Sequence, residues 1–172
     1  MTYLLIALVL AIIISPMLWL RQTPRQKQVT AMRQAASRAG FQVRLVPPPD
    51  AREGEGRLEY VSYILPWQPD TEPSPQPRME KWCLVRDTRR GDPAPWDNWQ
   101  WLGREANPAL TDIIGATVDS LPDTVKGLEA SHSGLSVYWQ ERGEVADIAT
   151  MKEQLLALMA AIRPPAVAAS AQ

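Results

Sequence analysis

The side chains that could perform acid–base or nucleophilic chemistry are few in this sequence of 172 residues. It contains one histidine, His132, in a Ser-His-Ser-Gly stretch between two short apolar segments. Ser131 and Ser133 adjoin this histidine, but neighbours in a turn seldom have the geometry of a nucleophile and its base. We therefore interpret His132 as an exposed turn residue, with a catalytic role as the less favoured alternative.

The sequence likewise offers no recognisable metal or cofactor site. Cys83 is the only cysteine, so neither an intrachain disulfide nor a multi-cysteine metal cluster can form. It lies in an apolar segment, which is typical of a buried, unreactive thiol. We find no nucleophile elbow, no glycine-rich phosphate loop and no calcium-binding loop. We therefore expect no metal and no cofactor.

These absences favour a protein that is not an enzyme, although they leave an enzyme of unfamiliar type open. Such an enzyme would use acidic residues on the sheet, with Glu59, Asp87 and Asp97 as the candidates. A concave pocket in which several carboxylates converge would favour that alternative.

Tryptophan is the one unusual feature of the composition, with six of the seven residues located beyond the N-terminal apolar segment. Trp99 and Trp101 are two residues apart, so in a strand they lie on the same face. As an exposed pair they would be candidate residues for binding a partner. The chain has only one phenylalanine, however, so tryptophan is also its available large core aromatic. Both interpretations stay open, and the core is the favoured one.

The N-terminal stretch Tyr3–Leu20 contains no charged residue over 18 positions. A helix of that length spans roughly 27 Å, close to the hydrocarbon thickness of a bilayer. We predict a transmembrane anchor with Leu4, Leu8 and Ile12 in the membrane and Trp19 at the headgroup level. A cleaved signal peptide is less favoured because no basic residue precedes the run, and a buried core helix would need a larger core.

The charges that follow this stretch predict its orientation. Basic residues occupy the flank without any acidic residue before Asp50: Arg21, Arg25, Lys27, Arg33 and Arg38. Such an excess normally stays in the cytoplasm, so the C-terminal domain should be cytoplasmic. Arg21, Arg25 and Lys27 are candidates for contact with anionic lipid, worth about 1 kcal/mol per cation. Equally, these charges could serve only to fix the topology.

The rest of the chain has the opposite charge balance. Residues 1–49 carry six basic and no acidic groups, whereas residues 50–172 carry 12 basic and 19 acidic groups. An acidic domain that follows a basic segment is typical of a membrane-tethered protein and does not indicate a nucleic-acid partner.

Periodicity predicts an α+β fold in which helices pack on one face of a mainly antiparallel sheet. Its expected parts are an anchor at 1–22, a basic juxtamembrane helix at 23–39, a soluble domain at 40–163 and a disordered tail at 164–172. Proline-rich residues 66–77 should form a surface loop, and 89–95 a turn. The expected strands span 41–46, 58–65, 80–87, 98–102, 125–130 and 135–140, and the expected domain helices 108–121 and 145–162.

Two apolar stripes predict how the domain coheres. We expect the helices at 108–121 and 145–162 to lie side by side, because the hairpin at 125–140 connects them and each needs an apolar surface to cover. Leu135, Val137 and Trp139 alternate along that hairpin and should lie beneath both helices. A four-residue loop at 131–134 should close the hairpin.

The segment Leu20–Gln28, Leu-Arg-Gln-Thr-Pro-Arg-Gln-Lys-Gln, follows the charge-free stretch at once. In this it resembles the membrane-exit segment of YajC-type accessory subunits of the bacterial protein-translocation machinery. The likeness covers about thirty residues, and the glycine-rich β segment of that family is missing after Gly40. For the anchor, the resemblance implies a single span of the bacterial inner membrane. The function that we expect, an accessory protein that binds a membrane-associated partner, follows from the tether, the missing catalytic constellation and the paired tryptophans.

Overall fold

The structure of the protein, a computed structural model, describes residues 3, 23–52, 58–67 and 81–162. Within these ranges the chain forms three α-helices, one short 3₁₀ helix and seven strands. Their bounds are α2 Pro24–Arg38, β1 Gln42–Val46, β2 Tyr60–Pro66, β3 Trp82–Arg86, β4 Asp92–Pro93, β5 Trp99–Trp101, η1 Pro108–Leu110, α3 Thr111–Ser120, β6 Val125–Ser131, β7 Gly134–Trp139 and α4 Val145–Ile162. The α+β class is therefore confirmed.

The strands form one antiparallel sheet in the order β1-β2-β7-β6-β3-β5-β4. Strands β2 and β3 follow one another in the chain, yet the β6–β7 hairpin lies between them. The predicted antiparallel sheet is confirmed. The turn expected at 89–95 contains the short strand β4, which pairs with β5 through Asp92 and Pro93.

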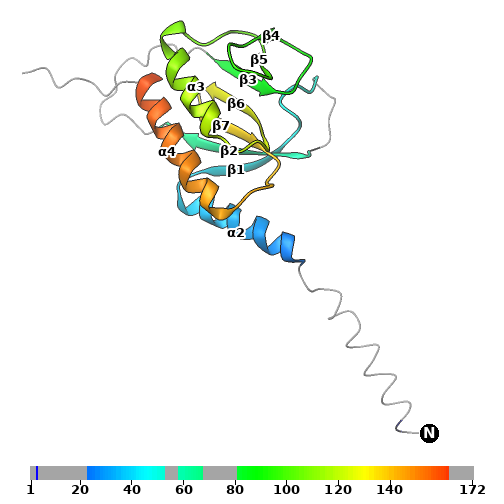
Figure 1. The fold of residues 1–172 in the computed structure, drawn as a ribbon. Helices are drawn as coiled ribbons and strands as arrows, with labels where there is room; N and C mark the ends of the chain where they lie inside the picture. The colour runs from blue at the N-terminus through cyan, green and yellow to red at the C-terminus, as the bar shows by residue number, and fades with distance from the viewer. Residues whose placement is uncertain (1–2, 4–22, 53–57, 68–80, 163–172) are drawn as a thin grey trace, which may run out of the picture.

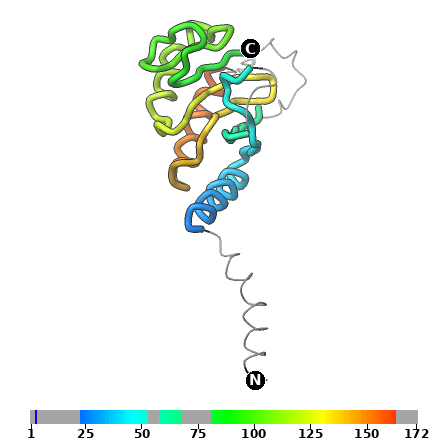
Figure 2. Tube along the Cα trace, turned by 90° about the vertical axis from the view of Figure 1, so that its right-hand side faces the viewer, coloured from blue at the N-terminus to red at the C-terminus, as the bar shows by residue number. Residues whose placement is uncertain are grey.

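The helices cover one face of this sheet, as Figure 1 shows, with α3 and α4 side by side. Helix α2 packs against α4 and β1 and leads out of the domain at the end away from β4 and β5 (Figure 2). The side chains of Leu135, Val137 and Trp139 are completely buried on the covered face. This confirms the expected packing of the hairpin beneath two adjacent helices.

Local sequence signals explain why α2 forms where it does. Thr23 caps its first turn, and the side chains and backbones of Thr23 and Gln26 bond reciprocally in a capping box. Pro24 fits the first turn because the N–H group that proline lacks would have no helical carbonyl to donate to there. Gly40 follows the helix with φ +95°, a conformation that glycine adopts without strain.

The β6–β7 hairpin is tighter than the sequence suggested. Ser131 pairs with Gly134, so only His132 and Ser133 form the loop, in place of the expected four residues. A side chain on Gly134 would lie 2.1 Å from the carbonyl oxygen of Leu65. Glycine at this position therefore lets both strands continue one residue further than their apolar patterns indicate.

The opposite face of the sheet is crossed by the segment that follows β1. Pro49 lies over Gly127, where a β-carbon would come within 3.3 Å of the proline ring. Further along, the Thr88 hydroxyl donates to the Asp50 carboxylate at 2.8 Å, and Arg90 donates to the carbonyl of Asp50. These contacts tie the end of the segment to the connection after β3.

Several predicted segments lie outside the described residues. They are the anchor apart from Tyr3, Arg21, most of the proline-rich loop and the C-terminal tail. Among the helices that the structure does describe, none combines the length and the apolar character that crossing a membrane requires.

Candidate functional site

The tryptophan pair that the sequence offered as a binding surface is buried. Trp99 and Trp101 are 2% and 5% exposed. Trp101 packs edge-to-face with Trp82 and Trp96, at centroid distances of 5.9 and 6.0 Å. Strand β5 pairs with β3, so that Trp101 is the ladder partner of Leu84 and Trp99 is the ladder partner of Arg86. Both tryptophans therefore lie on the same face of the sheet as the fully buried Leu84, which is the face that the helices cover. Trp99 and Trp101 are therefore core residues, and they do not form an exposed pair on the surface of this chain.

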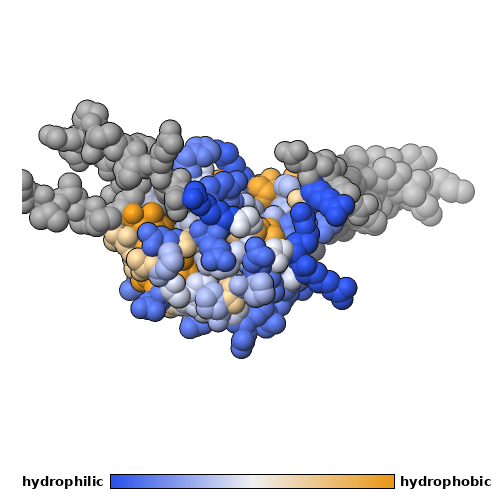
Figure 3. All heavy atoms as spheres, turned by 90° about the horizontal axis from the view of Figure 1, so that it is seen from above, coloured by the Kyte–Doolittle hydropathy of each residue, from blue (hydrophilic) through white to orange (hydrophobic). Residues whose placement is uncertain are grey.

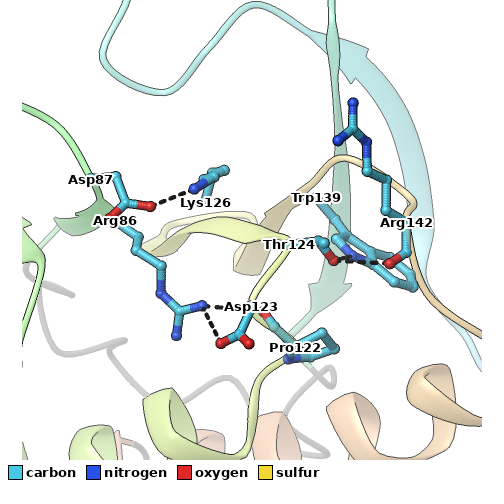
Figure 4. Close-up of polar contacts among 8 residues, drawn as sticks. All are labelled: Arg86, Asp87, Pro122, Asp123, Thr124, Lys126, Trp139 and Arg142. Atoms are coloured by element: carbon cyan, nitrogen blue, oxygen red, sulfur yellow. Dashed lines mark hydrogen bonds and ion pairs between the residues drawn. The ribbon is translucent and has the colours of Figure 1, made fainter.

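An arginine seals the edge of this tryptophan cluster. The guanidinium of Arg86 lies 4.8 Å from the ring centroid of Trp99. Its Nη1 atom is 3.4 Å from the carbonyl oxygen of Pro122 and from the carboxylate of Asp123 (Figure 4). The Asp123 side chain is fully exposed, so water screens the ion pair. These contacts connect β3 to the segment before β6. The Arg86 guanidinium therefore has a structural role.

The acidic residues proposed for an enzyme are not brought together. Asp87 pairs with Lys126 at 2.5 Å, as Figure 4 also shows. Glu59 precedes β2, whereas Asp87 follows β3, and two strands separate β2 from β3 in the sheet. Asp97 is exposed next to β5. In the described part of the chain, no group of three or more histidine, cysteine or acidic side chains could hold a metal ion.

The remaining sequence candidates also lack catalytic geometry. His132 is exposed at the hairpin tip, and the flanking serine hydroxyls are 2.9 Å apart and bond to each other. Burial raises the pKa of the Cys83 thiol to about 12, with a smaller contribution from the nearby carboxylate of Glu129. The thiol is therefore protonated at neutral pH and is a poor nucleophile.

Glu129 organises a polar cluster on the face opposite the helices. It accepts a hydrogen bond from the Tyr138 hydroxyl and lies 3.2 Å from the Lys81 ammonium. Burial first, and then the bond to Glu129, raise the pKa of Tyr138 above its ordinary range. Tyr138 therefore keeps its proton and donates to Glu129, while Lys81 is largely exposed. These contacts satisfy a mostly buried carboxylate and have a structural role.

The strongest polar site joins α2 to the connection between β7 and α4. Arg33 donates from Nε and Nη2 to the two carboxylate oxygens of Glu141, at 2.7 and 2.6 Å. The Tyr63 hydroxyl donates to the same carboxylate at 2.8 Å. Glu141 is 6% exposed and adopts φ +54°, a backbone conformation that is uncommon outside glycine. We call Arg33, Tyr63 and Glu141 the α2 clamp.

Electrostatics within the clamp favour its observed protonation state. The hydrogen bond to Glu141 is the main cause of a raised pKa for Arg33. Burial, followed by the bond to Glu141, raises the pKa of Tyr63. Arg33 is therefore charged and Tyr63 neutral at physiological pH. Each oxygen of the Glu141 carboxylate accepts at least one hydrogen bond, and arginine supplies the opposite charge, which is what a buried carboxylate requires.

Further contacts make α2 part of the domain. Gln28 donates from its side-chain amide to the carbonyl oxygen of Gly143 at 2.8 Å, one turn before the clamp. Met32 and Ala36 are completely buried and belong to the same core as the sheet. The helix that the sequence placed in a separate juxtamembrane part thus packs against α4 and β1 as part of the domain.

The exposed surface of α2 is basic where helix electrostatics favour acids. Arg25 and Lys27 are exposed in its first turns, and the first turn has no acidic residue. Cations at a helix N-terminus oppose the helix dipole, at a cost of about 0.3–1 kcal/mol each. Because Arg25 and Lys27 disfavour the start of the helix, we infer that they serve another purpose than helix stability.

The sequence interpretation missed the α2 clamp. Arg33 was placed with the basic residues that fix topology, and nothing in the neighbourhood of Glu141 distinguishes it from an exposed turn residue. The apolar alternation before Glu141 indicates that β7 is buried, but it does not identify a charged partner for the residues that follow the strand.

Comparisons of the chain with protein-family models, curated proteins and solved structures found no significant match.

Proposed function

We propose that this chain is a single-pass, membrane-anchored accessory protein without catalytic activity, which binds a membrane-associated protein partner through its α+β domain. The proposal places the anchor in the bacterial inner membrane and the domain in the cytoplasm. Its basis in the sequence is the charge-free stretch Tyr3–Leu20 and the basic flank that follows it.

The observation that carries the proposal is the α2 clamp. Helix α2 begins at Pro24, four residues after the charge-free stretch, and is fixed to the domain by Arg33, Glu141 and a buried Met32. Because α2 is part of the domain, only residues 21–23 lie between the domain and the charge-free stretch. So short a connection would keep the domain close to the membrane, which is useful to a protein that must meet a partner in the same membrane.

The surface chemistry of the domain agrees with binding more than with catalysis. Viewed from the side that is uppermost in Figure 1, the described surface is mainly hydrophilic, with smaller hydrophobic areas (Figure 3). Glu59 and Asp87 lie apart, and the thiol of Cys83 is partly buried and protonated at neutral pH. Exposed Arg25 and Lys27, close to the expected membrane surface, would contact anionic lipid headgroups.

The resemblance of Leu20–Gln28 to YajC-type subunits makes a protein-translocation complex one candidate partner. That resemblance ends before the domain, so the identity of the partner depends on the domain surface. Other inner-membrane complexes are equally compatible with the proposal.

Reporter fusions test the topology directly. We expect a C-terminal fluorescent protein that folds only in the cytoplasm to be active, and a C-terminal alkaline phosphatase that folds only in the periplasm to be inactive. The fusion should remain in the membrane fraction after washing with sodium carbonate. An active phosphatase, or release of the protein by carbonate, would contradict the proposal. Crosslinking in intact membranes followed by affinity purification then tests for a protein partner.

A further inference from the structure

The two outer edges of the sheet differ in their ability to accept another strand. Within the described residues β1 and β4 are the terminal strands. Strand β4 has only two residues, and Pro93 cannot donate a backbone hydrogen bond. Short strands and prolines are ways in which proteins block an edge. Strand β1 has five residues and contains neither proline nor glycine, so its edge is not blocked in this way.

The outer edge of β1 is also unoccupied by the described residues. Strand β1 pairs with β2 alone, and no backbone hydrogen bond outside that ladder involves residues 42–46. Leu45 is 53% exposed, although its ladder partner Val61 is 4% exposed. An unpaired edge offers a row of N–H and C=O groups, and the exposed Leu45 offers an apolar contact beside them.

The chemistry around this edge is positive. Arg44 is exposed in the middle of β1, where its guanidinium donates a 3.2 Å hydrogen bond to the neighbouring Gln42. Arg38 is exposed in the last turn of α2, shortly before the strand begins. The sequence has no acidic residue before Asp50. A strand that adds to this edge would therefore meet cations from α2 and β1 that have no carboxylate near them in the sequence.

This charge argues against a second copy of the chain as the occupant. If β1 pairs antiparallel with another β1 over all five residues, Arg44 lies directly opposite Arg44 of the other copy. Like charges at opposite positions destabilise a strand pair, whereas opposite charges stabilise it by about 0.2–1 kcal/mol. An acidic strand lacks this conflict.

We propose that the outer edge of β1 is a docking site for an extended segment of a partner protein. The segment adds to the sheet next to β1, carries acidic side chains opposite Arg44, and places an apolar side chain beside Leu45. This inference rests on the proposed accessory function and defines the partner of that function by its chemistry.

The test uses the full-length protein in detergent micelles and two synthetic peptides. One peptide alternates glutamate and valine over seven residues, and the other replaces each glutamate with lysine. Hydrogen exchange measured by mass spectrometry reports on β1, and fluorescence anisotropy reports on affinity. We expect the acidic peptide to slow exchange at residues 42–46 but not at 92–93. It should also bind about fivefold tighter than the basic peptide, or more.

Two variants test whether Arg44 is the residue that distinguishes the acidic peptide from the basic one. Arg44→Glu should reverse the preference, so that the basic peptide binds more tightly. Arg89→Glu, at an exposed arginine beyond β3, is the matched control and should leave the preference unchanged. An acidic peptide that is N-methylated at alternate residues should bind no better than the basic one, because it cannot complete the backbone ladder.

Three results would overturn the inference. They are an acidic peptide that leaves exchange in β1 unchanged, equal binding of the methylated and unmethylated peptides, and protection of β1 that rises with protein concentration without peptide. The last result would identify a second copy as the occupant. None of these measurements depends on membrane topology, so a failed topology test and a failed docking test are distinguishable.

Discussion

Arg33 on α2 and Glu141 after β7 are joined by two parallel hydrogen bonds, although 108 residues separate them in the chain. The pair fixes the first described helix to the end of the central hairpin. Nearly half of the Arg33 side chain faces solvent, at 45% exposure, whereas the Glu141 side chain is 7% exposed. Loss of the arginine therefore leaves a nearly buried carboxylate with Tyr63 as its remaining donor.

Arg33→Ala should lower the free energy of unfolding by about 1.5–3 kcal/mol, since hydrogen bonds to a buried charge are lost and the charge stays buried. Guanidinium denaturation of the full-length protein in micelles, followed by tryptophan fluorescence, measures this change. Arg38→Ala removes an exposed arginine from the same helix and should change stability by no more than about 0.5 kcal/mol. Equal effects of the two substitutions would show that the clamp contributes nothing.

Leu155→Ala should cost about 2–5 kcal/mol because Leu155 is completely buried in the core and its loss leaves a cavity. Its neighbour Leu156 is 38% exposed, so Leu156→Ala is the matched control and should cost less than about 1 kcal/mol. Denaturation curves of both variants give the difference. A small loss for Leu155→Ala would contradict the packing of α4 against the sheet.

Elements with strong local signals were predictable from the sequence. Helix α4 spans Val145–Ile162 as predicted, because its apolar stripe is long and prolines follow it. The start of α2 was predicted to within one residue from Pro24. Strand β4 was missed because two residues carry no periodicity, and the helix after Asn107 begins as a 3₁₀ turn that apolar spacing does not reveal.

Nonlocal relationships were not predictable. The insertion of the β6–β7 hairpin between β2 and β3 depends on pairing between segments far apart in the chain. Alternation put Trp99 and Trp101 on one face but could not say whether a helix covers that face. The partnership of Arg33 with Glu141 likewise depends on how α2 packs, which no local pattern encodes.

Stability should fall as the pH rises above about 9, and Cys83 should be part of the reason. Burial raises the pKa of its thiol from 9.0 to about 12. Between these values the unfolded chain loses a proton that the folded chain keeps, so folding becomes less favourable with rising pH. The slope from one such group is at most about 1.4 kcal/mol per pH unit.

Cys83→Ser should flatten the dependence of unfolding free energy on pH between 9 and 10. Tyr63 and Tyr138 also have raised pKa values from burial, but their unfolded counterparts ionise only near pH 10. The decline above pH 10 should therefore persist in the serine variant. Denaturation midpoints measured at half-unit intervals provide the comparison, and parallel profiles below pH 10 would rule out a contribution from the thiol.

Gly115→Ala should destabilise the protein, although alanine normally stabilises a helix relative to glycine by about 1 kcal/mol. A side-chain carbon at this position of α3 would lie 2.6 Å from Nε1 of Trp96, which itself packs against Trp101. Crowding of this kind costs about 1–3 kcal/mol. In a Trp96→Ala background the same substitution should become stabilising. If its sign is the same in both backgrounds, the contact with Trp96 is not the cause.

The part of the chain that folds independently should include α2. The sequence placed the domain at 40–163, a fragment expected to fold in water by itself. Helix α2 supplies Met32 and Ala36 to the core, and Arg33 neutralises Glu141. A fragment that begins at Gly40 lacks all three and leaves Glu141 with Tyr63 alone. A fragment that begins at Thr23 keeps them, together with the capping box of α2.

We therefore expect fragment 23–162 to unfold cooperatively in water, and fragment 40–162 to be less stable by at least about 3 kcal/mol or to remain unfolded. Circular dichroism and guanidinium denaturation of the two fragments measure the difference. Because both end at the same residue, any difference arises from α2. If the two fragments are equally stable, α2 is dispensable for folding and the boundary at residue 40 is correct.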